Sequence, residues 1–181
     1  MADRALFLDR DGVINVDHGY VYQQESFEFI PEIFELCKKA QAAGYRIFVI
    51  TNQAGIARGY YSVDDFNELT FWMVEEFQQR GIVIDKVYFC PHHPDKGNTE
   101  LTTQCNCRKP EPGMILQAQS EFNIDITNSI FIGDKVTDMQ AANAAGIKKN
   151  YLLASRYDDD ESILATRIAN LSEVLDVFEN V

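Results

Sequence analysis

The sequence has few basic residues and no long apolar run. Its 181 residues include 16 Lys plus Arg against 28 Asp plus Glu, so the formal net charge is −12. This shortage of cations argues against nucleic acid or an anionic membrane as a partner, because both require a basic face. No run approaches the roughly 18 apolar residues of a membrane span, and the N-terminus carries no signal-peptide pattern. We therefore expect a soluble cytoplasmic protein.

Internal repeats, low-complexity tracts and linkers are also missing from the sequence. The length suits one domain, and 46% hydrophobic residues supply a sizeable core. We predict a single domain over residues 1–181 that functions as a monomer. Short apolar runs alternate with amphipathic segments, which predicts a Rossmann-like α/β fold with a parallel sheet between two helical layers.

The expected elements follow from hydrophobic periodicity and from helix start and stop signals. The acidic run 158–161 is typical of a solvated loop. Strands are predicted over 5–8, 45–50, 82–89, 129–132 and 149–153, and helices over 31–43, 62–80, 113–122, 139–145 and 171–178.

Two carboxylates directly follow the first apolar run. Asp9 and Asp11 stand one residue apart and precede Gly12. In open α/β sheets the ligand crevice lies beyond the carboxyl ends of the strands, which is where these residues fall. The pair is compatible with a solvated surface turn, a metal or phosphate site, or a covalent nucleophile beside a general acid. The other motifs must decide.

Polar residues also end two further apolar runs. Thr51 follows the run 45–50, where its hydroxyl could bind phosphate oxygens or cap the next helix. Asp134 follows the run 129–132. Arg58, between small residues, could reach a second anionic group or cover the surface.

Three of the four cysteines lie near a histidine. Cys90 and His92 form one close pair, and Cys105 and Cys107 form another about a dozen residues later. Two such pairs favour a tetrahedral zinc site in a loop over residues 90–108, and four protein ligands make the metal structural. His93 is the alternative nitrogen ligand. Cys37 falls on the apolar side of its helix and is expected in the core.

The motifs together favour phosphoryl transfer. If the strands ending at Asp9, Thr51 and Asp134 are neighbours, these residues meet Asp11 and Lys109 in one crevice. Asp9 would attack phosphorus to form an aspartyl phosphate, while Asp11 acts as general acid and then base. Mg²⁺ would offset the repulsion between a carboxylate and a phosphate, and its ligands would be Asp9, Asp134 and the Asp11 carbonyl. Thr51 and Lys109 would bind phosphoryl oxygens.

These motifs resemble the haloacid dehalogenase superfamily of phosphatases. The matching positions are Asp9-Arg10-Asp11-Gly12, Thr51, Lys109 and the segment from Gly133 to Asp138. The stretches 51–59, 90–94, 105–110 and 133–135 resemble more narrowly its subfamily of heptose-bisphosphate and histidinol-phosphate phosphatases.

The resemblance implies a capless three-layer fold, a Mg²⁺-dependent enzyme, a structural Zn²⁺ loop and a phosphorylated sugar as substrate. It implies removal of the 7-phosphate of a heptose 1,7-bisphosphate during lipopolysaccharide synthesis, with histidinol phosphate as the alternative substrate. It assigns substrate recognition to Arg108 and Lys135. With Arg58, the expected pocket residues are Asp17, His18, Gly19, Tyr20, Asn52, Gln53 and Ala54.

A non-catalytic phospho-signalling module is the alternative from another class. Receiver domains also place strand-end acids, a Thr and a Lys around Mg²⁺. Such a module needs no general acid two residues beyond its phosphorylated aspartate, and it lacks a zinc loop. Asp11 therefore distinguishes the two classes.

Overall fold

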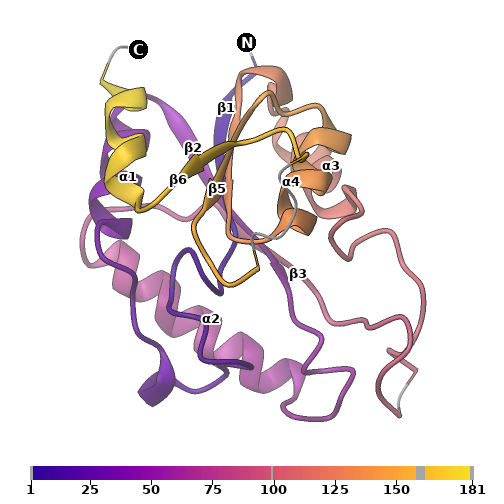
Figure 1. The fold of residues 1–181 in the computed structure, drawn as a ribbon. Helices are drawn as coiled ribbons and strands as arrows, with labels where there is room; N and C mark the ends of the chain where they lie inside the picture. The colour runs from indigo at the N-terminus through magenta and orange to yellow at the C-terminus, as the bar shows by residue number, and fades with distance from the viewer. Residues whose placement is uncertain (1, 99, 158–161, 180–181) are drawn as a thin grey trace.

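A six-stranded parallel sheet forms the centre of the molecule (Figure 1). The computed structural model describes residues 2–98, 100–157 and 162–179, so the predicted acidic loop 158–161 lies outside the described residues. The strand order is β3-β2-β1-β4-β5-β6, and every neighbouring pair is parallel. Strand β1 is therefore flanked by β2 and β4, as the proposed convergence of the acidic residues requires.

The described elements alternate between strands and helices along the chain. The strands are β1 (Arg4–Leu8), β2 (Tyr45–Asn52), β3 (Lys86–Cys90), β4 (Ile130–Gly133), β5 (Lys149–Leu153) and β6 (Thr166–Ile168). The α-helices are α1 (Ile33–Ala42), α2 (Val63–Gln78), α3 (Gly113–Phe122) and α4 (Val136–Ala145), and the 3₁₀ helices are η1 (Gln24–Ser26), η2 (Ile126–Asn128) and η3 (Leu171–Phe178).

Helices cover both faces of the sheet. Successive side chains of a strand point to opposite faces. In β1, Leu6 and Leu8 pack in the core that contains the apolar sides of α1, α2 and η3, whereas Ala5 and Phe7 pack in the core with α3 and α4. Because both faces are buried, the strand reads as a continuous apolar run. The predicted three-layer α/β class is confirmed.

The two connections that could carry a cap domain contain little regular secondary structure. Between β1 and α1 the described chain forms only η1, a helix of three residues. Between β3 and α3 the described residues form no helix or strand of their own. The part of the chain that the structure describes therefore contains no cap domain, in agreement with the prediction.

Several element boundaries differ from the prediction. The first helix does not begin at Pro31, because Glu32 adopts a left-handed conformation with φ 66° and the helix starts at Ile33. The third strand covers only Lys86–Cys90. Just before it, the Asp85 carboxylate accepts hydrogen bonds from Arg46 and from the amide of Ile47.

The predicted helix over 171–178 is a 3₁₀ helix, and β6 was not predicted. Strand β6 has three residues, of which two are exposed, so it lacks a periodic signal.

Other local predictions are confirmed. Ser62 and Asp65 form a reciprocal capping box at the start of α2. Cys37 is fully buried in the core, and burial raises the pKa of its thiol. Among the described helices, none has the length and apolarity needed to cross a bilayer.

Candidate active site

The carboxyl ends of β1, β2 and β4 meet at one edge of the sheet. Leu8 pairs with Val49 on one side and with Ile132 on the other. Asp9 follows Leu8, and its amide donates to the Ile132 carbonyl at 3.0 Å. Parallel pairing thus brings three polar strand ends, those with Asp9, Thr51 and Asp134, to the same edge.

Three buried aspartates form a carboxylate cluster. Carboxylate oxygens of Asp9, Asp134 and Asp138 all lie within 4.8 Å of one another. Burial, followed by the charge of Asp138, raises the pKa of Asp9 to about 7. Burial, followed by the charge of Asp9, raises the pKa of Asp134 to about 8. Atom Oδ1 of Asp134 is buried without a hydrogen-bond partner in the described chain. A cluster of crowded, partly unsatisfied carboxylate oxygens fits a hard divalent cation such as Mg²⁺.

Lys109 places a buried ammonium beside this cluster. Its Nζ lies 2.9 Å from Oδ1 of Asp9 and 2.8 Å from Oδ1 of Asp138, and it donates to the Ile50 carbonyl at 2.8 Å. Burial opposes its charge, but Asp138 and Asp9 raise the pKa of Lys109. The lysine is therefore a fixed cation at the bottom of the site.

Asn52 at the tip of β2 fixes the backbone of Lys109. The Asn52 side chain donates to the Lys109 carbonyl at 3.1 Å, and its Oδ1 accepts from the Lys109 amide at 3.0 Å. A half-buried side-chain amide is satisfied on both ends by one residue of a loop that comes 57 positions later. These two hydrogen bonds fix the position from which the Lys109 side chain extends into the site.

Asp11 lies at the wall of the site and is held by three side chains. Its Oδ1 accepts from Arg10 at 2.8 Å and from Asn15 at 3.1 Å, and its Oδ2 accepts from Gln53 at 3.1 Å. Burial acts to raise the pKa of Asp11, but the Arg10 guanidinium and the Arg10 and Asn15 hydrogen bonds outweigh it and lower the pKa. These contacts orient the Asp11 side chain and favour its ionised form.

A short relay connects Asp11 with Thr51. The Gln53 amide that donates to Asp11 also donates to Thr51 Oγ1 at 2.8 Å, and Gln53 Oε1 accepts from the Tyr61 hydroxyl at 2.5 Å. Both Thr51 and Gln53 are buried. Since Thr51 Oγ1 already accepts a hydrogen bond, its own proton is available for a ligand oxygen.

Gly12 allows Asp134 to approach the first strand. Its φ is +92°, and a Cβ built there would lie 2.2 Å from Asp134 Oδ2. Only glycine fits both the left-handed conformation and this close contact. The glycine after the two aspartates is thus required by the geometry of the carboxylate cluster.

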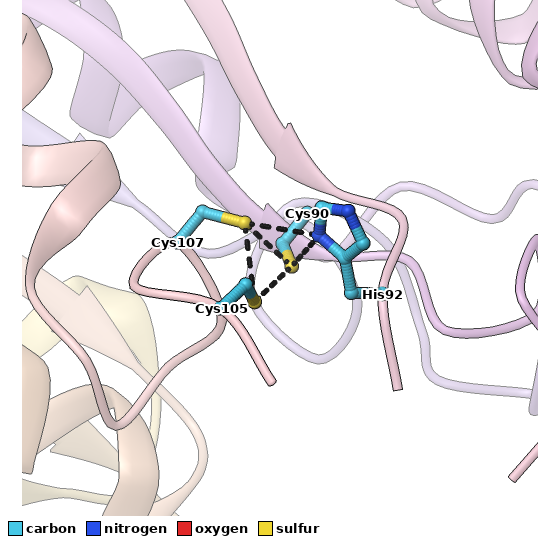
Figure 2. Close-up of side chains that lie close together, drawn as sticks. All are labelled: Cys90, His92, Cys105 and Cys107. Carbon is cyan, nitrogen blue, oxygen red and sulfur yellow. Dashed lines mark hydrogen bonds between the residues drawn. The ribbon is translucent and has the colours of Figure 1, made fainter. Parts of the chain in front are cut away.

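The four predicted zinc ligands come together in one cluster (Figure 2). Cys107 Sγ lies 2.9 Å from Cys90 Sγ and 3.4 Å from Cys105 Sγ, and His92 Nδ1 lies 3.3 Å from Cys107 Sγ. Ligands of one tetrahedral zinc ion are separated by roughly 3.5 Å, so this arrangement is compatible with zinc. All four cysteines of the chain are free thiols.

His93, the alternative ligand, is engaged elsewhere. Its Nδ1 accepts from the amides of Asp95 and Lys96 at 3.1 and 2.9 Å. His93 lines the pocket beside the carboxylates.

A pocket of about 350 Å³ opens over Asp9 and Asp11. Its described lining contains five Lys or Arg residues and four Asp residues, so cationic side chains are better represented here than in the chain as a whole, which has a net charge of −12. Among the predicted residues it includes Asp9, Asp11, Asp17, Gly19, Tyr20, Asn52, Gln53, Ala54, Arg58, Arg108, Lys109 and Lys135.

Three predicted residues are placed otherwise. Thr51 and Asp134 lie buried behind the described lining. His18 is largely exposed, and its Nε2 lies 3.0 Å from Oε2 of Glu28. The structure does not bring His18 to the described pocket wall.

Several lining residues were not predicted from the sequence. Asp138 belongs to the quoted motif, but no role was assigned to it. Tyr61, His93, Thr137, Arg156 and Tyr157 also line the pocket. Arg156 and Tyr157 follow β5 and carried no local signal.

Comparison with known proteins gives consistent matches. The family model described as HAD-hydrolase-like matches residues 106–174. A D-glycero-beta-D-manno-heptose-1,7-bisphosphate 7-phosphatase from Vibrio cholerae serotype O1 is 45% identical over 98% of this chain and 95% of its own length. A D-glycero-alpha-D-manno-heptose-1,7-bisphosphate 7-phosphatase from Campylobacter jejuni is 47% identical over 99% of this chain and 98% of its own length.

A solved structure gives a similar result. The D,D-heptose 1,7-bisphosphate phosphatase from B. bronchiseptica, complexed with magnesium and phosphate, superposes with a TM-score of 0.81 at 27% identity. The match covers 97% of this chain and 98% of that one.

Proposed function

The chain belongs to the haloacid dehalogenase-like hydrolases, and from this premise we propose that it removes the 7-phosphate of D-glycero-D-manno-heptose 1,7-bisphosphate. The relatives that carry this activity in their names cover nearly the whole chain. The enzyme class is phosphoric monoester hydrolase, and the named reaction fits the synthesis of lipopolysaccharide heptose. The observation that supports the proposal most is the meeting of Asp9, Asp11, Lys109 and Asp134 at one sheet edge.

The carboxylate cluster would hold Mg²⁺ through Asp9, Asp134 and the main-chain carbonyl of Asp11. Repulsion between a carboxylate and a phosphate dianion at about 3.5 Å is on the order of 10 kcal/mol at an effective dielectric constant near 20. The bound cation would supply the compensating charge at the transferred phosphoryl group. The unpartnered Oδ1 of Asp134 and the raised pKa values of Asp9 and Asp134 support a cation at this position.

Asp9 is the proposed nucleophile. Lys109 Nζ and the Arg10 amide both lie within 2.9 Å of its Oδ1, which orients the carboxylate toward the pocket. As the bond from Asp9 to phosphorus forms, the bond from phosphorus to the C7 oxygen breaks. Lys109 and the Thr51 hydroxyl stabilise the phosphoryl oxygens as charge shifts among them.

Asp11 is the proposed general acid and base. It gives its proton to the departing C7 oxygen, and it then takes a proton from the water that attacks the aspartyl phosphate and releases Asp9. The lowered pKa of Asp11 suits the second step. For the first step, the negative charge of the incoming phosphate raises the pKa of the carboxyl, because a nearby like charge favours the protonated form.

The charge of the pocket favours a bisphosphate over histidinol phosphate. Arg58, Arg108 and Lys135 line the pocket in addition to the buried Lys109. Arginine and lysine side chains can bind a second phosphate group, and histidinol phosphate has no such group. Histidinol phosphate remains the alternative that the experiment must exclude.

The remaining assignments complete the proposal. Zn²⁺ at Cys90, His92, Cys105 and Cys107 would be structural, since four protein ligands occupy every tetrahedral position. Residues 1–181 act as one phosphatase domain and as a monomer, in the cytoplasm, where thiolate ligands stay reduced.

A substrate comparison tests the proposal. Phosphate release is measured with the α and β anomers of the heptose 1,7-bisphosphate and with histidinol phosphate, each in the presence of Mg²⁺. We expect kcat/KM on one of the heptose anomers to exceed that on histidinol phosphate by at least about 100-fold, equivalent to roughly 3 kcal/mol. A higher kcat/KM on histidinol phosphate would overturn the assignment.

A further inference from the structure

The segment that follows β5 forms part of the pocket wall, although no motif of the sequence pointed to it. Arg156 and Tyr157 both line the pocket, and they lie on a different segment from the other cationic lining residues, which come from residues 58, 108, 109 and 135. The segment follows β5, the neighbour of β4 on the side away from β1. It therefore adds a separate cationic wall to the site.

A hydrogen-bonded serine joins this segment to the carboxylate cluster. The Ser155 hydroxyl donates to the main-chain carbonyl of Asp134 at 2.5 Å and accepts from the Tyr157 amide at 3.1 Å. The position of Tyr157 is thereby fixed relative to the strand end that carries Asp134. The serine hydroxyl contacts only main-chain atoms of Asp134 and Tyr157, so the Asp134 carboxylate takes no part in the link.

The Tyr157 ring lies against two cations. Lys135 Nζ is 4.6 Å from the ring centroid, and the Arg156 guanidinium carbon is 4.8 Å from it. Lys135 Nζ also lies 3.6 Å from Oδ2 of Asp17. An aromatic face attracts cations. Tyr157 can therefore keep two like charges near the same place without direct contact between them.

Four cationic lining residues lie beyond Lys109, and of these only Lys135 is within ion-pair distance of a carboxylate in the described chain, that of Asp17. Lys109 already serves the bottom of the site, where it contacts Asp9 and Asp138. A guanidinium presents a planar set of donors that matches a phosphate, whereas an alcohol leaving group alone offers no charge to bind.

We propose that Arg156 and Tyr157 form a specificity wall for the second anionic group of the substrate, the phosphate that is not hydrolysed. Arg156 contacts that group directly, and Tyr157 is a positioning residue that holds Lys135 and Arg156 toward it. This inference rests on the proposed function, because it requires a substrate with two phosphates.

The test compares two substrates that differ only in the second phosphate. Phosphate release is measured with heptose 1,7-bisphosphate and with heptose 7-phosphate for the wild type, Arg156→Gln, Tyr157→Ala and Tyr157→Phe. Arg156→Gln should raise KM for the bisphosphate about tenfold and leave kcat nearly unchanged, while the kinetics on the monophosphate stay at the wild-type level. The difference should shrink at high salt, because exposed charges are screened.

The tyrosine variants separate positioning from folding. Tyr157→Ala should raise KM for the bisphosphate in the same way, and Tyr157→Phe, which retains the ring, should restore it. Arg80→Gln is the matched control, since Arg80 pairs with Glu76 on α2 and does not belong to the described pocket lining. Thermal unfolding of each variant checks that the fold is kept.

The outcomes distinguish this inference from the function on which it rests. If the wild type prefers the bisphosphate but Arg156→Gln changes both substrates equally or neither, the specificity wall is wrong and the proposed function stands. If the wild type prefers histidinol phosphate, both fail, because that substrate has no second phosphate.

Discussion

Asp138 joins Lys109 to the loop that carries Asp134. One carboxylate oxygen of Asp138 lies 2.8 Å from Lys109 Nζ, and the other accepts from the amides of Asp134 and Lys135 at 3.1 and 3.0 Å. Lys109 and Lys135 line the pocket, and Asp138 itself is buried. The Asp138 carboxylate therefore fixes the position of the Lys109 ammonium relative to the end of β4.

Replacement of Asp138 should weaken both contacts. Asp138→Asn removes one of the two carboxylates that pair with the buried Lys109. Because Asp9 still contacts the ammonium, the change should cost less than the complete loss of a buried partner, on the order of 1–3 kcal/mol. We expect the free energy of unfolding to fall by roughly that amount and kcat to fall at least about tenfold. Urea unfolding and phosphate-release kinetics measure the two effects. Asp64→Asn, at an exposed position on α2, is the control, and an unchanged Asp138→Asn protein would contradict the linkage.

Replacement of Asp9 and replacement of Asp11 should impair the reaction at different steps. Asp9→Asn removes the proposed nucleophile, so turnover should fall by about three orders of magnitude or more with the fold intact. Asp11→Asn retains the nucleophile but removes the acid and base, so a phosphorylated protein should accumulate and release phosphate slowly. Rapid-quench measurement of protein-bound phosphate separates them. Wild-type phosphate release by Asp11→Asn would instead favour the signalling module.

The zinc cluster should support the position of Lys109. Cys107 lies two residues before Lys109, so loss of its thiolate frees the segment that leads into the active site. We expect Cys107→Ser to lose zinc, to unfold at lower temperature and to show a reduced kcat. Cys37→Ala is the matched control because Cys37 is buried in the core and lies outside the cluster. Metal analysis that finds no zinc in protein purified under reducing conditions would contradict this interpretation.

Protein freed of Mg²⁺ should lose stability as the pH rises. Burial raises the pKa of Asp9 to about 7 and of Asp134 to about 8 in the folded chain, above the ordinary value of 3.8. Between pH 4 and about 8 the folded state therefore holds more protons than the unfolded state, and stability decreases with pH across this range. The stabilisation by Mg²⁺ should accordingly be larger at pH 8 than at pH 5.

Thermal unfolding with and without Mg²⁺ at both pH values measures this effect. Asp134→Asn is the comparison, because it removes one of the two titrating groups and should flatten the pH dependence. An equal Mg²⁺ effect at pH 5 and pH 8 would contradict the role of these carboxylates.

The sequence revealed those parts of the site that follow a strand directly. Asp9, Thr51 and Asp134 were found because an apolar run that ends in a polar residue is visible without coordinates, and parallel pairing then brings such ends together. Asp138 was not assigned a role because its burial depends on how α4 begins. Arg156 and Tyr157 were missed because nothing in their neighbours indicates that the chain after β5 turns toward the pocket.

Boundaries that depend on single backbone conformations or tertiary contacts were the least predictable. The sequence around Pro31 is typical of a helix start, yet the left-handed Glu32 delays the helix. Ile82 and Ile84 suggest a strand, and both are buried, but they take no part in the ladder, which begins at Lys86.

The reciprocal hydrogen bonds between Asn52 and Lys109 have a consequence for the zinc loop. They attach the far end of the zinc loop to the central sheet, while the Gln53 amide donates to the Cys90 carbonyl at 2.8 Å and attaches its near end. With both ends anchored, the residues between the two pairs of zinc ligands can change in length or composition while Lys109 keeps its place in the pocket. The zinc loop can therefore vary there without disturbing the residues proposed for phosphoryl transfer.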